Sequence, residues 1–99
     1  MNIEGMKNRR IRVAILKALK VEHPGSIDTK VLYFYLDSYG YPLLEDELAA
    51  HLAYLQEKGY LKVERKHGKG YDISHVTLTA KGWDLYDGIE QDKGVDDEL

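Results

Sequence analysis

Two kinds of side chain in this sequence could carry chemistry, the histidines and a run of three acids. The histidines are His23, His51, His67 and His75. They lie in different segments, without the spacing between ligands that a metal site shows. The acids stand at 45–47, and neighbouring residues of a helix point about 100° apart, so they do not form a pair of cooperating carboxylates. No serine or threonine lies in a nucleophile motif. We therefore predict no catalytic site, no metal, no cofactor and no small-molecule substrate, and a protein that is not an enzyme.

Positive charge is concentrated in two segments, where it suits phosphate rather than catalysis. Residues 1–20 hold six basic side chains and one acid, a net charge of +5, and residues 62–70 have a net charge of +3. The candidate nucleic-acid-binding residues are Arg9, Arg10 and Arg12 in the first segment and Arg65, Lys66, His67 and Lys69 in the second. Two glycines in the second would let its backbone approach a phosphate or a minor groove. Both segments are equally open to the plainer interpretation of solvated surface charge.

The composition indicates one soluble domain. Its 99 residues, 43% hydrophobic and 31% charged, are enough for a single modest core. The sequence has no cysteine, no apolar run near the roughly 18 residues of a membrane span, and no signal-peptide pattern at its N-terminus. We therefore expect a cytoplasmic protein without a membrane partner.

The spacing of apolar residues predicts a first helix over residues 7–22. One stripe recurs at helical spacing and comprises Ile11, Ala14, Ile15, Ala18 and Leu19. Val13 and Leu16 fall on nearly the opposite face, beside basic residues. Another segment, another subunit or solvent must cover these two side chains, and the sequence leaves the choice open.

A second helix is predicted over residues 27–38, with Ser26 or Asp28 as its N-cap. Ile27 could form a short strand just before it. The aromatic run at 33–35 also favours a strand, but the length of the segment and its capping residue favour a helix.

A third helix is predicted over residues 44–58. Leucines at 44, 48, 52 and 55 keep one of its faces apolar, and Gly59 stands where a left-handed C-cap belongs.

A β-hairpin and a short last helix follow. YLKVER and YDISHVTLT read as strands on either side of the glycine-rich turn KHGKG. The return strand changes its alternation near Ser74-His75, which predicts a bulge there. Thr79 would cap a helix that ends at Gly88. We therefore expect a domain over residues 1–88 and an acidic tail over 89–99 that is flexible or packed only in part.

The acidic tail has two interpretations. Residues 84–99 carry seven acids and one lysine, a net charge of −6. They would either screen the basic body of the same chain or form a solvated C-terminus, and the second interpretation is the plainer one.

The predicted order is helix, short strand, two helices, hairpin and short helix, which is the chain order of a winged helix. The fold class is therefore mostly α with a small β-hairpin. A three-helix helix-turn-helix core is followed by the hairpin, called the wing, and by a short C-terminal helix.

Particular motifs carry a family resemblance. The run LAYLQEKGYLKVER…VTLTAKGWDLYDG is similar to a segment of many winged-helix proteins, in which a leucine-spaced helix ends in EKG and the wing closes in LT-x-x-G. Over nearly its full length the chain also resembles small winged-helix proteins of Mu-like prophages. The shared features are the basic first helix, the Tyr54-Leu55-x-x-x-Gly59 junction, the closing segment Leu78-Thr79…Gly82…Asp84-Leu85…Gly88, and Gly94-Val95. The broad resemblance implies double-stranded DNA as partner, transcriptional control and often dimers, and the narrow one implies a phage or bacterial host.

The third helix would be the reading helix of this motif, but its charges do not suit a phosphate-lined groove. Asp46, Glu47 and Glu57 would point outward, without the basic and amide side chains that pair best with base edges. The acids at 45–47 also suit the positive end of the helix dipole, and this structural interpretation is favoured over base contact. DNA contact is therefore expected at the wing and at the N-terminal helix.

Apolar and aromatic residues also predict a protein interface, formed by Val13, Leu16, Tyr33 and Tyr54. Two hypotheses follow. The first is a winged-helix DNA-binding protein, a phage-type transcriptional regulator that works as a homodimer and contacts the DNA backbone through the wing and the N-terminal basic helix. The second is a winged-helix protein-interaction module with an acidic third-helix face and little or no DNA binding.

Overall fold

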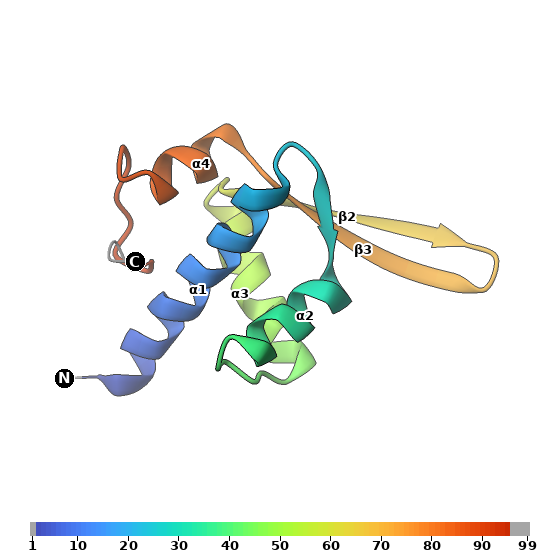
Figure 1. Ribbon diagram of the computed structural model, residues 1–99, viewed down its shortest axis with the longest axis horizontal. Coiled ribbons are helices and arrows are strands. Elements are labelled where there is room, and N and C mark those ends of the chain that lie inside the picture. Colours follow the sequence, from blue (N-terminus) through green and yellow to red (C-terminus); the bar gives the residue numbers. More distant parts are fainter. Residues whose placement is uncertain (1, 96–99) are drawn as a thin grey trace.

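The computed structural model describes residues 2–95, except for the side chains of residues 71 and 72. Its elements are α1 (Ile3–Glu22), β1 (Ser26–Asp28), α2 (Thr29–Ser38), α3 (Glu45–Glu57), β2 (Leu61–Gly68), β3 (Tyr71–Leu78) and α4 (Ala80–Tyr86). The first three helices pack together, and the β2–β3 hairpin projects away from them (Figure 1). This is a winged helix, as the sequence predicted.

Side-chain caps set where the first two helices begin. The Asn2 side chain accepts a hydrogen bond from the Gly5 N–H at 3.1 Å, so α1 begins earlier than the predicted residue 7. The Asp28 side chain accepts one from the Lys30 N–H at 2.7 Å and starts α2. Ile27 pairs with Val76 in the antiparallel sheet, whose strand order is β1-β3-β2. The short strand before the second helix is therefore confirmed.

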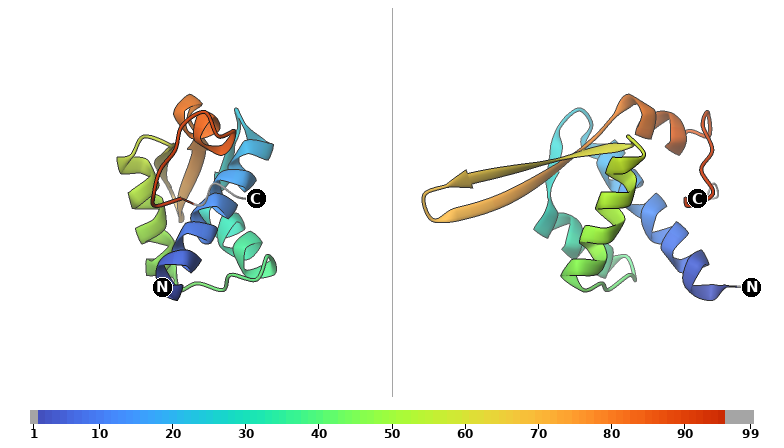
Figure 2. Two further views of the ribbon diagram at one scale, coloured as in Figure 1. Left: turned by 90° about the vertical axis from the view of Figure 1, so that its left-hand side faces the viewer. Right: turned by 180° about the vertical axis from the view of Figure 1, so that it is seen from behind.

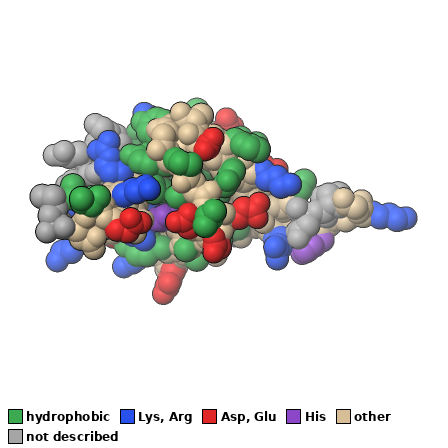
Figure 3. All heavy atoms as spheres, turned by 90° about the horizontal axis from the view of Figure 1, so that it is seen from below, with side chains coloured by type: hydrophobic (Ala, Val, Ile, Leu, Met, Phe, Trp, Pro, Cys, Tyr) green, Lys and Arg blue, Asp and Glu red, His purple; other side chains and the backbone are tan. Residues whose placement is uncertain are grey.

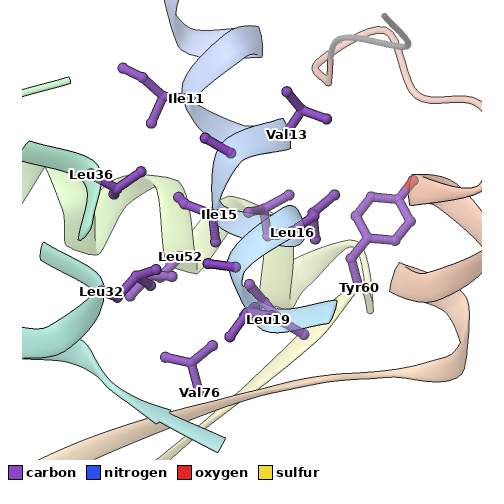
Figure 4. Close-up of a cluster of buried hydrophobic side chains, with 14 of the residues drawn as sticks. Ile11, Val13, Ile15, Leu16, Leu19, Leu32, Leu36, Leu52, Tyr60 and Val76 are labelled. Atoms are coloured by element: carbon purple, nitrogen blue, oxygen red, sulfur yellow. The ribbon is translucent and has the colours of Figure 1, made fainter. Parts of the chain in front are cut away.

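Helix α1 is buried on two faces, which corrects the interface predicted at Val13 and Leu16. These side chains are 8% and 0% exposed, inside one hydrophobic core with Tyr60, Leu85 and Val95. Figure 4 shows Leu16 on the side of α1 that faces Tyr60. Other segments of the same chain cover the second apolar strip, so it offers no surface to a second subunit.

The junction between α3, the wing and α4 explains the EKG and LT-x-x-G motifs. Gly59 has a φ of +85°, which favours glycine at the end of α3. The Thr79 hydroxyl donates to the Gly59 carbonyl at 2.6 Å and accepts from the Gly82 N–H at 3.0 Å. Gly82 is buried against the Tyr60 backbone, where a Cβ would overlap the Tyr60 carbonyl oxygen. Both motifs therefore serve the fold.

The wing is a continuous hairpin, which corrects the predicted bulge near Ser74-His75. Pairing runs without interruption from Leu61↔Leu78 to Gly68↔Tyr71. Val76 and Leu78 are buried at the base, while Ile73 on the opposite face is half-buried. The outer half of the hairpin extends past the core (Figure 1). Neither face of this outer half rests on the core. The alternation of apolar and polar residues along β3 can therefore change without a bulge.

The segment after α4 turns back toward α1 (Figure 2), and its last described residues are packed. Asp92 accepts hydrogen bonds from the hydroxyls of Tyr54 at 2.8 Å and Tyr60 at 2.6 Å. The Gly94 N–H donates to Asp92 at 2.7 Å, and Val95 is 3% exposed. Residues 92–95 are therefore packed against the fold, which corresponds to the packed-in-part alternative for the predicted tail. Residues 96–99 lie outside the described residues.

No helix within residues 2–95 is both long and apolar enough to cross a membrane.

Candidate nucleic-acid interface

The wing tip, residues 65–70, presents four predicted DNA-binding side chains to solvent. Arg65, Lys66, His67 and Lys69 are all exposed. The eight residues of β2, at roughly 3.3 Å each, give the hairpin a length of about 26 Å. The turn at its end is closed by Gly70 with a φ of +87°. The molecule is 47 Å along its longest axis, and the wing tip forms one end of it (Figure 1).

The positive charge of the wing increases toward its tip. Nearer the base, Lys62 and Glu64 form an exposed ion pair at 3.5 Å, so their charges offset each other. Beyond that pair, residues 65–74 carry Arg65, Lys66 and Lys69 against Asp72, a net charge of +2. A projecting basic hairpin can contact phosphates without bringing the acidic body close to DNA.

The basic cluster of α1 lies at the opposite end of the long axis from the wing tip (Figure 1). The two predicted DNA-binding clusters therefore do not form one surface on a single chain. Arg10 is exposed and Arg9 is half-buried.

Arg12 is half-buried and is held by contacts within the fold, so it is less available to DNA than the sequence analysis assumed. Its Nε donates to His51 Nδ1 at 3.2 Å, and its Nη1 donates to the Gly94 carbonyl at 3.0 Å. Its guanidinium lies 3.9 Å from the centre of the Tyr54 ring. These contacts join α1, α3 and the C-terminal segment, so Arg12 is a structural residue.

His51 is buried at 6% exposure, and it accepts the hydrogen bond from Arg12. Burial, followed by the positive charge of Arg12, lowers the pKa of His51. The ring is therefore neutral at pH 7, which leaves Nδ1 free to accept. His51 is thus a buried structural histidine, hydrogen-bonded to Arg12. Among the described residues, no cluster of histidine and acidic side chains could hold a metal ion.

Asp92 is the structural residue that sequence reasoning missed. Partial burial by itself would raise the pKa of Asp92, but hydrogen bonds from Tyr60, the Gly94 N–H and Tyr54 lower it overall. Burial and the bond to Asp92 raise the pKa of both tyrosines. The available signal was Val95, an apolar residue preceded by glycine in a polar tail.

The outward face of α3 is acidic and lies between the two basic ends. Asp46, Glu47 and Glu57 are exposed, as predicted, together with Ala50 and Ala53. Figure 3 shows acidic side chains gathered on the underside of the body, between the basic side chains of the wing and those of the other end.

Glu47 also has a structural role at the start of α3. Its side chain accepts a hydrogen bond from the Leu44 N–H at 2.8 Å. This contact supports the structural interpretation of the acids in the first turn.

The remaining interface candidates differ in their surroundings. Tyr54 is half-buried and is held within the fold by Asp92 and Arg12, and its place in an interface stays a prediction. Tyr33 is half-buried, and its ring packs edge-on against the Phe34 ring with 5.7 Å between the ring centres. Phe34 and Val31 on α2 are 66% and 58% exposed, and they lay outside the interface predicted from the sequence.

This chain is similar to known proteins in its three-dimensional structure. Neither protein-family models nor curated proteins match this chain. A proposed transcriptional regulator from Thermoplasma acidophilum superimposes with a TM-score of 0.66 at 21% identity, over 82% of this chain and 75% of that one. A PadR-family transcriptional regulator from Eggerthella lenta gives 0.61 at 17% identity, over 76% of this chain and 66% of that one.

A third similar structure is Bacillus subtilis PadR in complex with operator DNA, with a TM-score of 0.62 at 17% identity over 90% of this chain. The chain spans 52% of that protein. At these identities the likeness concerns the fold, and it agrees with the element order: the chain has a winged-helix fold shared with PadR-type transcriptional regulators.

Proposed function

We propose that this chain is a DNA-binding transcriptional regulator that grips duplex DNA through its wing tip. The observation that carries the proposal is the projection of Arg65, Lys66 and Lys69 on a hairpin that extends beyond the core. The similar Bacillus subtilis structure, which holds operator DNA, supports duplex DNA as the ligand.

The proposed contact is with the DNA backbone. Lysine and arginine side chains neutralise phosphates, and Gly68 and Gly70 allow the main chain of the wing tip to come close. The acidic face of α3 is repelled by phosphates, so α3 does not enter the major groove in this proposal. Affinity therefore comes from charge, and discrimination between sequences is weak.

The basic cluster of α1, Arg9, Arg10 and Arg12, contributes less to DNA binding in this proposal than the sequence predicted. Arg12 is committed to the fold, and α1 begins at the far end from the wing tip. Arg9 and Arg10 would therefore reach DNA only if the duplex extended along the molecule or a second chain joined the complex. A homodimer and a phage setting stay predictions from sequence resemblance.

A salt series tests the proposal. Binding of a labelled duplex, followed by fluorescence anisotropy, is expected to weaken with a slope of about −3 in log K against log salt concentration, since roughly three phosphates are neutralised per chain at about −0.9 each. Affinity that does not change with salt would contradict backbone contact by the wing.

A second candidate function is protein binding through α3. It is favoured by one observation, the exposed acidic face that separates the two basic ends. In this alternative a basic partner protein binds α3. Absence of duplex binding even at low salt, together with a partner whose binding requires Asp46 and Glu57, would support it over the first proposal.

A further inference from the structure

A pocket of about 430 Å³ lies between the first turns of α1 and the segment that follows α4. This volume falls within the range of roughly 300–1,000 Å³ that is usual for small-molecule sites. The pocket is open to solvent, and it lies at the opposite end of the long axis from the wing tip. It is therefore a second candidate site, separate from the proposed DNA contact.

The wall of the pocket is cationic. Arg9 and Arg12 contribute to it from α1, and Lys93 contributes from the C-terminal segment. None of the described residues that line the pocket is acidic. A concave surface lined by charges of one sign concentrates the electric field inside it. The pocket should therefore attract small anions.

Arg9 has an unsatisfied hydrogen-bond donor at this place. Its Nε is buried and makes no hydrogen bond within the described part of the chain. A buried donor without an acceptor is costly, and donors on charged groups are the most costly. Because Arg9 lines the pocket, a modest rotation of its side chain would present this donor to an oxygen atom of a bound anion. A guanidinium pairs well with phosphate and carboxylate groups, whose two oxygen atoms match its planar fork.

The two arginines of the pocket differ in what they can offer to a ligand. Arg12 already donates to His51 at 3.2 Å and to the Gly94 carbonyl at 3.0 Å. Arg9 is half-buried and Lys93 is exposed. An entering anion would therefore pair with Arg9 and Lys93, while Arg12 would contribute mainly its charge.

The pocket also has an apolar side. Met6 lines it and is 48% exposed, so the uncharged part of a ligand could pack against a thioether side chain. A small organic molecule with one anionic group fits this combination of cationic and apolar walls.

We propose that this pocket binds a small organic anion through a phosphate or carboxylate group, which pairs with Arg9 and Lys93. The bound anion satisfies the Arg9 Nε. It also joins α1 to the C-terminal segment at a second point beside the Arg12–Gly94 hydrogen bond. The site is independent of DNA binding, so it is tested without DNA.

Titration of the full chain with inorganic phosphate and, separately, with acetate tests the proposal. The NMR resonance of the Arg9 Nε–H group reports on the pocket, and sodium chloride at equal ionic strength is the control. We expect this resonance to shift and to saturate, with a dissociation constant on the order of 1 mM for the better probe. Saturation by phosphate alone would assign the site to phosphate-bearing ligands, and saturation by acetate alone would assign it to carboxylates. A resonance that neither anion moves more than chloride does would overturn the proposal.

Substitutions separate the pocket from general charge effects. The backbone amide of Gly94, which lines the pocket, gives the readout for the variants. Arg9→Gln is expected to weaken binding of the better probe by about tenfold or more, and Lys93→Gln by about threefold. The matched control is Lys7→Gln, which removes one exposed charge of α1 outside the pocket and should change the affinity less than twofold. If Arg9→Gln does not fold, Lys93→Gln carries the comparison. Equal weakening by Lys93→Gln and Lys7→Gln would contradict a defined site.

Discussion

Replacing Arg65, Lys66 and Lys69 together by alanine is expected to weaken binding to duplex DNA on the order of 100-fold at about 50 mM salt. All three side chains are exposed on the projecting wing, so the substitutions remove phosphate contacts without opening the core. The slope of log K against log salt should lose about 3 units, because each lost phosphate contact removes nearly one. Anisotropy titrations at several salt concentrations measure both quantities.

The matched control removes three charges elsewhere. Lys7, Lys17 and Lys81 are exposed and lie outside the wing, so their triple alanine variant should keep the salt slope and lose less than about threefold in affinity. Equal losses in the two triple variants would mean that overall charge, rather than the wing tip, holds the DNA.

Gly82→Ala is expected to destabilise the protein by about 3 kcal/mol or more. The new Cβ would overlap the carbonyl oxygen of Tyr60, and it would stand 2.7 Å from a methyl carbon of Leu78. A backbone oxygen cannot turn aside as a flexible side chain can, so α4 must move away from the base of the wing. Thermal or urea unfolding measures the loss, which corresponds to roughly 12 °C or more in the midpoint.

Gly5→Ala serves as the control for this substitution. A Cβ at Gly5 would meet nothing closer than the Asn2 side chain at 3.4 Å, and alanine is the better helix former. The control should therefore be as stable as wild type or slightly more stable. A Gly82→Ala variant that unfolds at the wild-type midpoint would show that α4 does not pack closely on the Tyr60 backbone.

Local signals made the fold predictable from the sequence. Asp28 and Thr79 cap helices through their own neighbours, and Gly59 ends α3 with a positive φ. Each of these signals acts over a few residues, so the chain order of a winged helix could be read directly. The exposure of the wing tip followed from the same reasoning, because a glycine-rich turn between two strands has no core to enter.

Long-range packing could not be predicted in the same way. Arg12 contacts His51 and Gly94, which are 39 and 82 residues away. From the sequence alone, Arg12 was therefore interpreted as a surface charge, because its partners are distant along the chain. Val13 and Leu16 posed the same problem, because the core around them includes residues far along the chain, Tyr60, Leu85 and Val95. The sequence left their cover open, and the interface predicted for these two residues was wrong for this reason.

The predicted bulge was wrong because residue alternation was used in a part of the strand that has no buried face. Alternation in a strand reports an inside face and an outside face only where one face is buried. At Val76 and Leu78 that condition holds, since both are buried. Toward the tip the hairpin leaves the core, and Ile73 no longer needs to share their face.

In the proposed function the wing tip binds duplex DNA, and the outward face of α3 does not. NMR of the backbone amides during a titration with duplex DNA tests it most directly. We expect the largest shifts at residues 64–70 and small shifts along the outward positions of α3, such as Asp46, Ala50 and Ala53. Large shifts along α3 with an unaffected wing tip would contradict the account and return the reading role to the third helix.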